Sequence, residues 1–430
     1  MLKTLAPALV RGIYRWDLVA LTINGVIGGG IFGLPSSLYQ HSGAYSLLAL
    51  VVCGLVAGSI SFCFAEVGSR FIETGGPYLY ARTAFGPIIG FEAGWLAWVT
   101  RVTAFATLCN LFVTYLGYFW PAATTGWRRT LLITVIVTVF TAINLVGVRH
   151  AASVSDIFAV GKLIPILFFI VAGLFYIKPA AFSSVVQPTF KGFSLSVLLA
   201  VFAFGGFEYT GMVSGETRDP RRNLPFAILA SLAVAVLIYL LIQLVCIGTL
   251  PGLASSQRPL ADASQRFLGG AGATIITLGA LISIAGTMNI IMLAAPRLLF
   301  AMGEQGQLPA WFASIHPRLK TPHTAIFVSS AVILVFTLSG TFIYALTISA
   351  MARLLYYATT CAALPVLRRR QAERAAFQIP FGTAVAVLTV GLCLWVVSSS
   401  AWRDARDLGI AAAIGLALYA AHRLFRTAVC

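Results

Sequence analysis

Charged residues are scarce in this chain, where Asp, Glu, Lys and Arg together make up 10% of 430 residues and hydrophobic residues make up 59%. A soluble domain carries about 25% charged residues, so the composition excludes an ordinary soluble protein. Acidic residues are the rarest charged type, with 13 against 29 lysines and arginines, and the net charge is +16. The basic residues cluster in short segments between apolar runs, which membrane topology explains better than a nucleic-acid partner does.

Motifs for metal binding, disulfides and catalysis are also lacking. The seven cysteines lie mostly inside apolar runs and form no CxxC, and the five histidines include no pair at ligand spacing. The sequence therefore indicates neither a disulfide framework nor a metal site, and we expect no cofactor. No cluster of nucleophile, base and orienting group is recognisable, so we do not expect an enzyme.

Long apolar runs are what the chain has in abundance, close to the ~20 residues that cross a bilayer. They predict an all-α integral membrane protein with about twelve transmembrane helices. The runs leave no room for a large soluble domain, so residues 1–430 are expected to form a single membrane domain. The predicted spans are 17–39, 44–66, 89–119, 130–148, 156–177, 194–216, 225–249, 272–302, 323–341, 343–366, 380–400 and 407–425.

The distribution of basic residues predicts the orientation of the chain. With the N-terminus inside, about twice as many lysines and arginines fall in cytoplasmic segments as in external ones. The N-terminal segment lacks a long apolar core and is typical of a cytoplasmic tail, not of a cleaved signal. We therefore expect a multi-pass protein of the cell membrane with both termini in the cytoplasm.

Three consecutive glycines, Gly28, Gly29 and Gly30, interrupt the first predicted span. A transmembrane helix tends to unwind at such a point, and lipid cannot satisfy the exposed N–H and C=O groups. The break must then contact protein or line a cavity. A cavity at mid-depth that is edged by free backbone dipoles is typical of a carrier for small charged solutes.

A second pair of glycines, Gly205 and Gly206, interrupts the sixth predicted span. The two breaks are five spans apart, which indicates two five-helix repeats, 17–177 and 194–366, with opposite orientations in the membrane. Matching interruptions in inverted repeats point to a transport site. The broken ends offer N–H groups to a carboxylate and C=O groups to an ammonium.

Two other interpretations apply to these glycines. Glycines spaced by four, such as Gly25, Gly29 and Gly33, also allow close helix packing in membranes. The segment from Gly28 to Gly33 matches GxGxxG as well, but a membrane helix lacks the strand–turn–helix context that a dinucleotide site requires.

Ionisable residues inside predicted spans are candidates for function. Glu208 follows the second break and could bind a proton or a cationic group, or it could pair with a neighbour. Lys162 lies in the fifth span, where a buried ammonium could bond the carbonyls of the broken first helix, carry a proton, or extend to the cytoplasmic interface. Arg101 and Trp98, in the third span, are candidate cavity residues, and Arg101 could instead have a structural role, paired with Glu92 or Glu208.

Other charged and aromatic residues receive simpler interpretations. Arg297 and Arg353 are expected at the interface or in helix packing, and Glu66 and Glu73 in cytoplasmic ion pairs. Three aromatic residues near the second break are candidates for a gate or for plain packing, namely Phe204, Phe207 and Tyr209.

Four segments together resemble the amino acid–polyamine–organocation superfamily over nearly the whole chain. Residues 25–35 resemble its first-helix signature and residues 202–208 its sixth helix. Residues 216–225 resemble the cytoplasmic linker that follows, and residues 296–309 the end of the eighth helix. The resemblance implies a LeuT-type fold, in which two inverted five-helix repeats are followed by two further helices, here 380–425, and amino acids cross by alternating access.

The resemblance also implies roles for individual residues. Ile27, Gly28, Gly29, Gly30 and Ile31, with Phe204, Gly205, Gly206, Phe207 and Glu208, would bind the α-carboxylate and α-amino groups of the substrate. Lys162 would take the place of a sodium ion, with first-helix carbonyls and a hydroxyl of Ser283 or Thr287 as partners. One departure is the triple glycine, since many members have Gly-Ser-Gly there, and the missing hydroxyl removes a side-chain contact to the carboxylate.

The expected function is secondary active transport of neutral or varied amino acids, by proton-coupled symport or by exchange. The partners would then be an amino acid, protons and the lipid bilayer. The first alternative is an exchanger of cationic amino acids or polyamines that uses Glu208 as the counter-charge. The second alternative is a passive channel.

Overall fold

The computed structural model describes residues 14–71, 76–146, 162–182, 187–212, 217–370 and 375–429, and this part of the chain is built of helices. Seven helical segments are long and apolar enough to cross a membrane, and four apolar helices are shorter. The long segments are Leu34–Gly68, Pro87–Leu116, Gly126–Val146, Pro220–Thr249, Pro259–Glu304, Phe342–Arg370 and Trp402–Leu424. The short ones are Lys162–Leu174, Phe190–Val201, His323–Ser339 and Gly382–Ser398. Within these ranges the prediction of an all-helical chain is confirmed, and the long apolar helices are consistent with the predicted multi-pass membrane protein.

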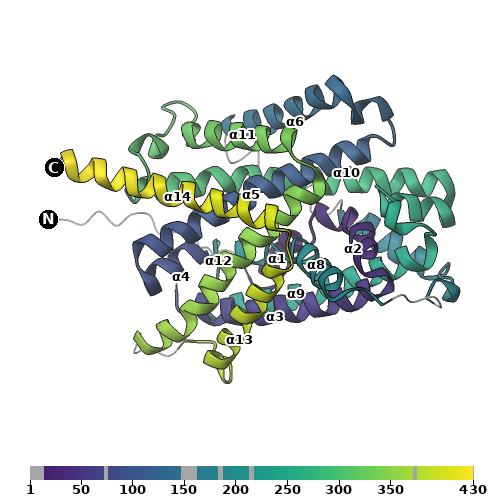
Figure 1. Ribbon diagram of the computed structural model, residues 1–430, viewed down its shortest axis with the longest axis horizontal. Helices are drawn as coiled ribbons and strands as arrows, with labels where there is room; N and C mark the ends of the chain where they lie inside the picture. Colours follow the sequence, from purple (N-terminus) through teal and green to yellow (C-terminus); the bar gives the residue numbers. More distant parts are fainter. Residues whose placement is uncertain are drawn as a thin grey trace.

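Three helices form the centre of the bundle (Figure 1): α5 (Pro87–Leu116) packs against both α10 (Pro259–Glu304) and α12 (Phe342–Arg370). On one side, α6 (Gly126–Val146) lies beside α11 (His323–Ser339). On the opposite side, α3 (Ser46–Gly68) lies beside α9 (Pro220–Thr249).

Three further helices pack around this arrangement. α4 (Gly76–Phe85) precedes α5 and packs against it, and α13 (Gly382–Ser398) packs on α12 and α3. The last helix, α14 (Trp402–Val429), crosses the outside of the bundle in yellow in Figure 1, and its apolar window is only 11% buried. Its exposed apolar side chains are suited to lipid.

The first predicted span is interrupted at the triple glycine. α1 (Arg15–Val26) ends there, a short 3-10 turn η1 (Gly29–Phe32) follows, and α2 (Leu34–Ser42) continues the chain. A Cβ at Gly29 would lie 2.8 Å from the backbone Cα of Ile284 in α10. This close approach of two backbones requires glycine at position 29.

The sixth predicted span is interrupted at the glycine pair. α8 (Phe190–Val201) ends before residues 202–206, which form turns, and the 3-10 turn η5 (Phe207–Met212) follows. Gly206 has a φ of +116°, which side-chain-bearing residues rarely adopt. A Cβ there would lie 2.3 Å from the carbonyl oxygen of Gly25. The two interruptions therefore lie against each other.

Several predicted boundaries fall partly outside the described residues. The spans 130–148, 156–177 and 194–216 each run past the described segments, and Glu73 lies outside them as well. The count of twelve spans, the two inverted repeats and the added pair of helices stay predictions. α10 is longer than its predicted span because it continues, across a bend at Gly269 (φ +65°), into an N-terminal portion that begins at Pro259.

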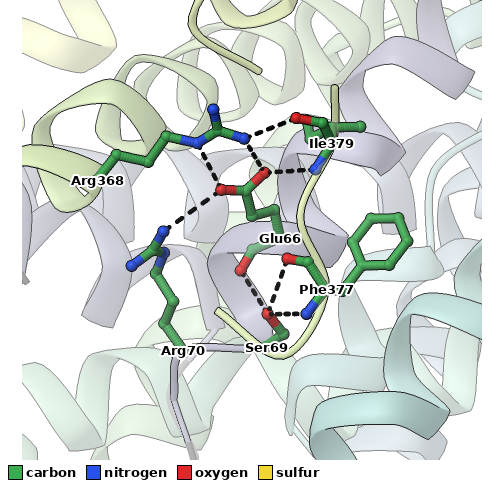
Figure 2. Close-up of polar contacts among 6 residues, drawn as sticks. All are labelled: Glu66, Ser69, Arg70, Arg368, Phe377 and Ile379. Carbon is green, nitrogen blue, oxygen red and sulfur yellow. Dashed lines mark hydrogen bonds and ion pairs between the residues drawn. The ribbon is translucent and has the colours of Figure 1, made fainter. Parts of the chain in front are cut away.

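A buried polar cluster joins the end of α3 to α12 and to the chain that enters α13 (Figure 2). Glu66 has no exposed surface and accepts hydrogen bonds from Arg368, from the backbone N–H of Ile379 and from Arg70. Ser69 adds backbone contacts to Phe377. The ion pairing expected of Glu66 is thus present, and it fixes three segments that are distant in sequence.

Candidate functional site

The two helix interruptions border a cavity with an empty volume of about 530 Å³, which includes the space at its opening. Side chains of α5, α9, α10 and α12 complete the wall. The lining consists of Asn24, Gly25, Val26, Gly28, Gly29, Gly30, Ile31, Ala104, Leu108, Phe202, Ala203, Gly205, Gly206, Tyr239, Thr287, Ile290, Ile291 and Arg353.

The first interruption directs backbone N–H groups toward the cavity. The N–H of Gly28 bonds the carbonyl of Val26, and that of Gly29 donates to Thr287 Oγ1 at 3.2 Å. The first N–H groups of a helical turn have no partner within it. Gly30 and Ile31, at the start of η1, carry N–H groups of this class, and both residues line the cavity.

Tyr239 of α9 connects the two interruptions. Its hydroxyl oxygen lies 2.8 Å from the carbonyl of Val26 and 2.8 Å from the carbonyl of Ala203. One hydroxyl hydrogen can be donated to only one of these carbonyls at a time. The side chain is buried, so it ties the broken ends together where regular helical bonds are missing.

Lys162 contacts the other free carbonyl of the first interruption. Its Nζ donates to the carbonyl of Asn24 at 2.5 Å, and the residue is 3% exposed. In a continuous helix that carbonyl would accept from the N–H of Gly28, which bonds Val26 instead. The break thus creates the acceptor that the buried ammonium uses.

Thr287 and Ser283 lie one turn apart on α10. The Thr287 hydroxyl donates a hydrogen bond to the carbonyl of Ser283 and accepts one from the N–H of Gly29. The Ser283 hydroxyl oxygen is buried and has no hydrogen-bond partner among the described residues. Four residues further back, a Cβ at Gly279 would lie 2.5 Å from Pro165, so this part of α10 packs against the helix that carries Lys162.

Glu208 lies behind the second interruption and does not face the cavity. Its Oε2 accepts from the N–H of Gly206 and from the hydroxyl of Tyr357, both at 2.7 Å, and its Oε1 accepts from Tyr356 at 3.0 Å. Arg353 and Arg101 are close enough to interact with it electrostatically. The carboxylate is thereby held by its own backbone and by α12.

Arg353 of α12 projects into the cavity against the second interruption. Its Nη1 donates to the free carbonyl of Phe202 at 3.2 Å, and the residue is 7% exposed. A Cβ at Gly205 would lie 1.1 Å from that nitrogen. The absence of a side chain at position 205 is what gives the guanidinium its place.

Comparison with known proteins identifies the family. The family model described as "Amino acid permease" matches residues 13–407 of the chain. The chain belongs to the amino acid permease family. The permease is 31% identical to the methylthioribose transporter of Bacillus subtilis (strain 168) over 414 residues, which cover 92% of this chain and 89% of the relative.

Two further relatives come from the same organism. The serine/threonine exchanger SteT is 28% identical over 93% of both chains. The branched-chain amino acid permease BcaP is 26% identical over 96% of this chain and 93% of its own. The permease is therefore similar to transporters along nearly its whole length. This confirms the resemblance of its sequence to the amino acid–polyamine–organocation superfamily.

The structure places only some of the predicted site residues of the permease in the cavity wall. Gly28, Gly29, Gly30, Ile31, Gly205, Gly206 and Thr287 line it. Ile27, Phe204, Phe207, Glu208, Lys162, Ser283, Arg101 and Trp98 are buried but are not among the lining residues. Trp98 donates to Ser329 of α11, and Arg101 donates to the carbonyl of Ala97 in its own helix.

Sequence reasoning missed several residues of the wall, among them Arg353, Tyr239 and Phe202. It assigns Arg353 to the interface or to helix packing. The structure shows the residue buried and packed against Gly205 and Phe202, and it adds that Arg353 also lines the cavity. The position of Arg353 inside an apolar span is the signal that could have found it. Tyr239 and Phe202 give no comparable signal, because a single aromatic residue in a transmembrane helix is ordinary.

Proposed function

We propose that the permease is a secondary active transporter that moves amino acids across the cell membrane by alternating access. Its two repeats, 17–177 and 194–366, would lie inverted around the cavity, the helices of 380–425 would flank them, and both termini would be cytoplasmic. The observation that carries the proposal is the cavity between two interrupted helices. Unpaired backbone groups of this kind bind the two charged ends of an amino acid without any dedicated side chain.

Each of the two interruptions would bind one charged end of the substrate. The N–H groups of Gly30 and Ile31 bind the α-carboxylate at the start of η1. Backbone carbonyls of the second interruption, between Phe204 and Glu208, accept from the α-amino group. Gly28, Gly29, Gly205 and Gly206 keep the backbones bare, so that the substrate reaches these groups.

Lys162 couples transport to the proton gradient in this proposal. The ammonium stabilises the interrupted first helix through the carbonyl of Asn24, and loss of the proton would weaken that hydrogen bond. Ser283 and Thr287 lie on the part of α10 that packs near Lys162 and supply hydroxyls to the same region. Glu208 is a structural carboxylate here, because its oxygens are already occupied.

The test is uptake of radiolabelled amino acids into proteoliposomes with and without an inward proton gradient. The wild-type protein should show saturable uptake and counterflow that the gradient stimulates. Lys162→Ala should lose the stimulation, whereas Lys191→Ala, a change at an exposed lysine of α8, should keep it. A Lys162→Ala protein with full, pH-sensitive uptake would refute the coupling role, and the absence of uptake of any amino acid would refute the function.

The same assay tests the alternatives. Uptake of methylthioribose in place of amino acids would indicate a substrate like that named for the relative with 31% identity. Competition by arginine or putrescine against a labelled neutral amino acid would indicate a cationic exchanger. Single-channel currents without counterflow would indicate a channel.

A further inference from the structure

The part of the cavity wall that faces the two interruptions is aliphatic. The helices α5 and α10 both pack against η1, and their side chains in the wall include Ala104, Leu108, Ile290 and Ile291. Resting on the proposed transport of amino acids, we infer that these four residues form the subsite for the substrate side chain. The substrate class is accordingly an amino acid with an aliphatic or thioether side chain, and the four residues determine this specificity.

Helical spacing places these side chains on one face of each helix. Ala104 and Leu108 are four residues apart on α5, and Ile290 and Ile291 follow Thr287 by three and four residues on α10. Residues at these intervals share a helix face. Thr287 contacts the first interruption, since its Oγ1 accepts a backbone N–H there at 3.2 Å. The aliphatic wall therefore begins one turn along α10 from that contact.

The ring of Phe202 continues the apolar wall beside the interruptions. A Cβ at Gly30 would lie 2.6 Å from Cε1 of this ring, so the ring lies directly against the first interruption. Phe202 itself belongs to the second interruption and lines the cavity. An aromatic ring here excludes water from the backbone groups and adds apolar contact for the substrate side chain.

Three polar side chains of the wall interact with the protein itself. The Thr287 hydroxyl donates within its own helix, and the Tyr239 hydroxyl lies between two backbone carbonyls. Arg353 donates to the carbonyl of Phe202 at 3.2 Å, and its charge acts on the buried Glu208. These contacts stabilise the interruptions, and the inferred subsite uses none of the three side chains.

Asn24 is the side chain of the wall that would favour a different substrate. It lies near the end of α1, one turn ahead of the triple glycine, and it lines the cavity. Serine or threonine would need such a partner, because a buried hydroxyl without a hydrogen bond is costly. The structure favours an aliphatic substrate, since this single amide lies on α1 and the four aliphatic side chains lie on two other helices.

The first experiment measures uptake into proteoliposomes for a graded series of amino acids. From alanine through 2-aminobutyrate to norvaline, the KM should fall by about 4-fold for each methylene group that is buried. Serine and threonine should have a KM about 10-fold above those of 2-aminobutyrate and valine, which match them in size. Methionine should resemble leucine, because its thioether is also apolar.

Two substitutions test size and polarity separately. Ala104→Val narrows the subsite and should raise the KM for leucine more than that for alanine, whereas Ala413→Val, at an exposed position of α14, should change neither. Leu108→Asn keeps the size of the side chain but adds an amide, and it should raise the KM for leucine by about 10-fold relative to that for serine. Leucine should also raise the thermal stability of the wild-type protein more than serine does, because binding stabilises the folded state.

The outcomes distinguish this inference from the function on which it rests. Uptake of serine, threonine or glutamate with a lower KM than leucine and methionine overturns the inference and leaves amino acid transport standing. A wild-type preference for serine that Asn24→Ala removes overturns it as well and assigns the subsite to Asn24. If the wild-type protein takes up no amino acid, the proposed function fails, and the inference fails with it.

Discussion

Arg368 and Glu66 form a two-point ion pair at the ends of α12 and α3. The Nε of Arg368 lies 2.7 Å from Oε1 of Glu66, and its Nη2 lies 2.6 Å from Oε2 (Figure 2). The same Nη2 donates to the carbonyl of Ile379, whose N–H returns a bond to Glu66. A fully buried carboxylate thus holds two helices and the chain that enters α13 in one arrangement.

We expect Arg368→Gln to lower the free energy of unfolding by about 3 kcal/mol, because removal of one partner leaves the other charge buried. Arg406→Gln is the matched control. It breaks an exposed pair with Asp407 on α14 and should cost less than about 1 kcal/mol. Thermal and denaturant unfolding in detergent measure both changes. Equal losses in the two variants would contradict the role of the buried pair.

Alanine substitutions at different glycines of the triple glycine should differ in how much stability they cost. At Gly29 a Cβ would lie 2.8 Å from the backbone of Ile284, which cannot move aside, whereas at Gly28 the nearest atom is a methyl group of Thr287 at 3.3 Å. We expect Gly29→Ala to cost about 3 kcal/mol or more and Gly28→Ala about 1 kcal/mol or less. The yield of folded protein and thermal unfolding test this order. A Gly29→Ala protein as stable as Gly28→Ala would show that the first interruption does not press on α10.

Gly206→Ala should be among the most damaging single changes. The position has a φ of +116°, and a Cβ would come within 2.3 Å of the carbonyl oxygen of Gly25. Backbone strain of this kind alone costs about 1–3 kcal/mol, and the clash adds to it. Gly391→Ala, in α13 with open space around it, should be neutral or stabilising by up to about 1 kcal/mol. The folded yield and the thermal unfolding of the two variants test this expectation. Normal stability of Gly206→Ala would be inconsistent with the structure.

The hydrogen bond from Tyr357 to Glu208 should contribute more than a neutral one. Tyr357→Phe removes a donor at 2.7 Å from a buried carboxylate, and we expect a loss of about 2 kcal/mol. Tyr115→Phe removes an equally buried bond, at 2.8 Å, to the neutral carbonyl of Phe32 and should cost about 1 kcal/mol. Thermal unfolding of both variants provides the comparison. The opposite order would indicate that Glu208 is protonated in the folded protein.

The amino-acid sequence is sufficient to predict the class of protein and the position of the two interruptions. Low charge and repeated apolar runs leave few alternatives to a helical membrane protein, because lipid accepts only structures that satisfy their own backbone groups. Adjacent glycines inside such runs mark where a helix is weakest. The breaks at residues 28–30 and 205–206 are therefore predictable from local sequence.

The faces of the helices are not predictable in the same way. A transmembrane helix is apolar all round, so its sequence carries little periodicity to show which side meets lipid, protein or a cavity. Sequence reasoning accordingly places Trp98 near the cavity, although it bonds Ser329 of α11. It places Arg353 in packing for the same reason.

Sequence by itself determined that this protein is a membrane transporter of broken helices, because composition and glycine placement act locally along the chain. The tertiary structure decided which charged side chain reaches the cavity. Glu208 is turned to Tyr357, and Arg353 enters the cavity beside Gly205. The residues of the first pair are 149 positions apart, and only the packing of whole helices fixes contacts between residues so distant in sequence.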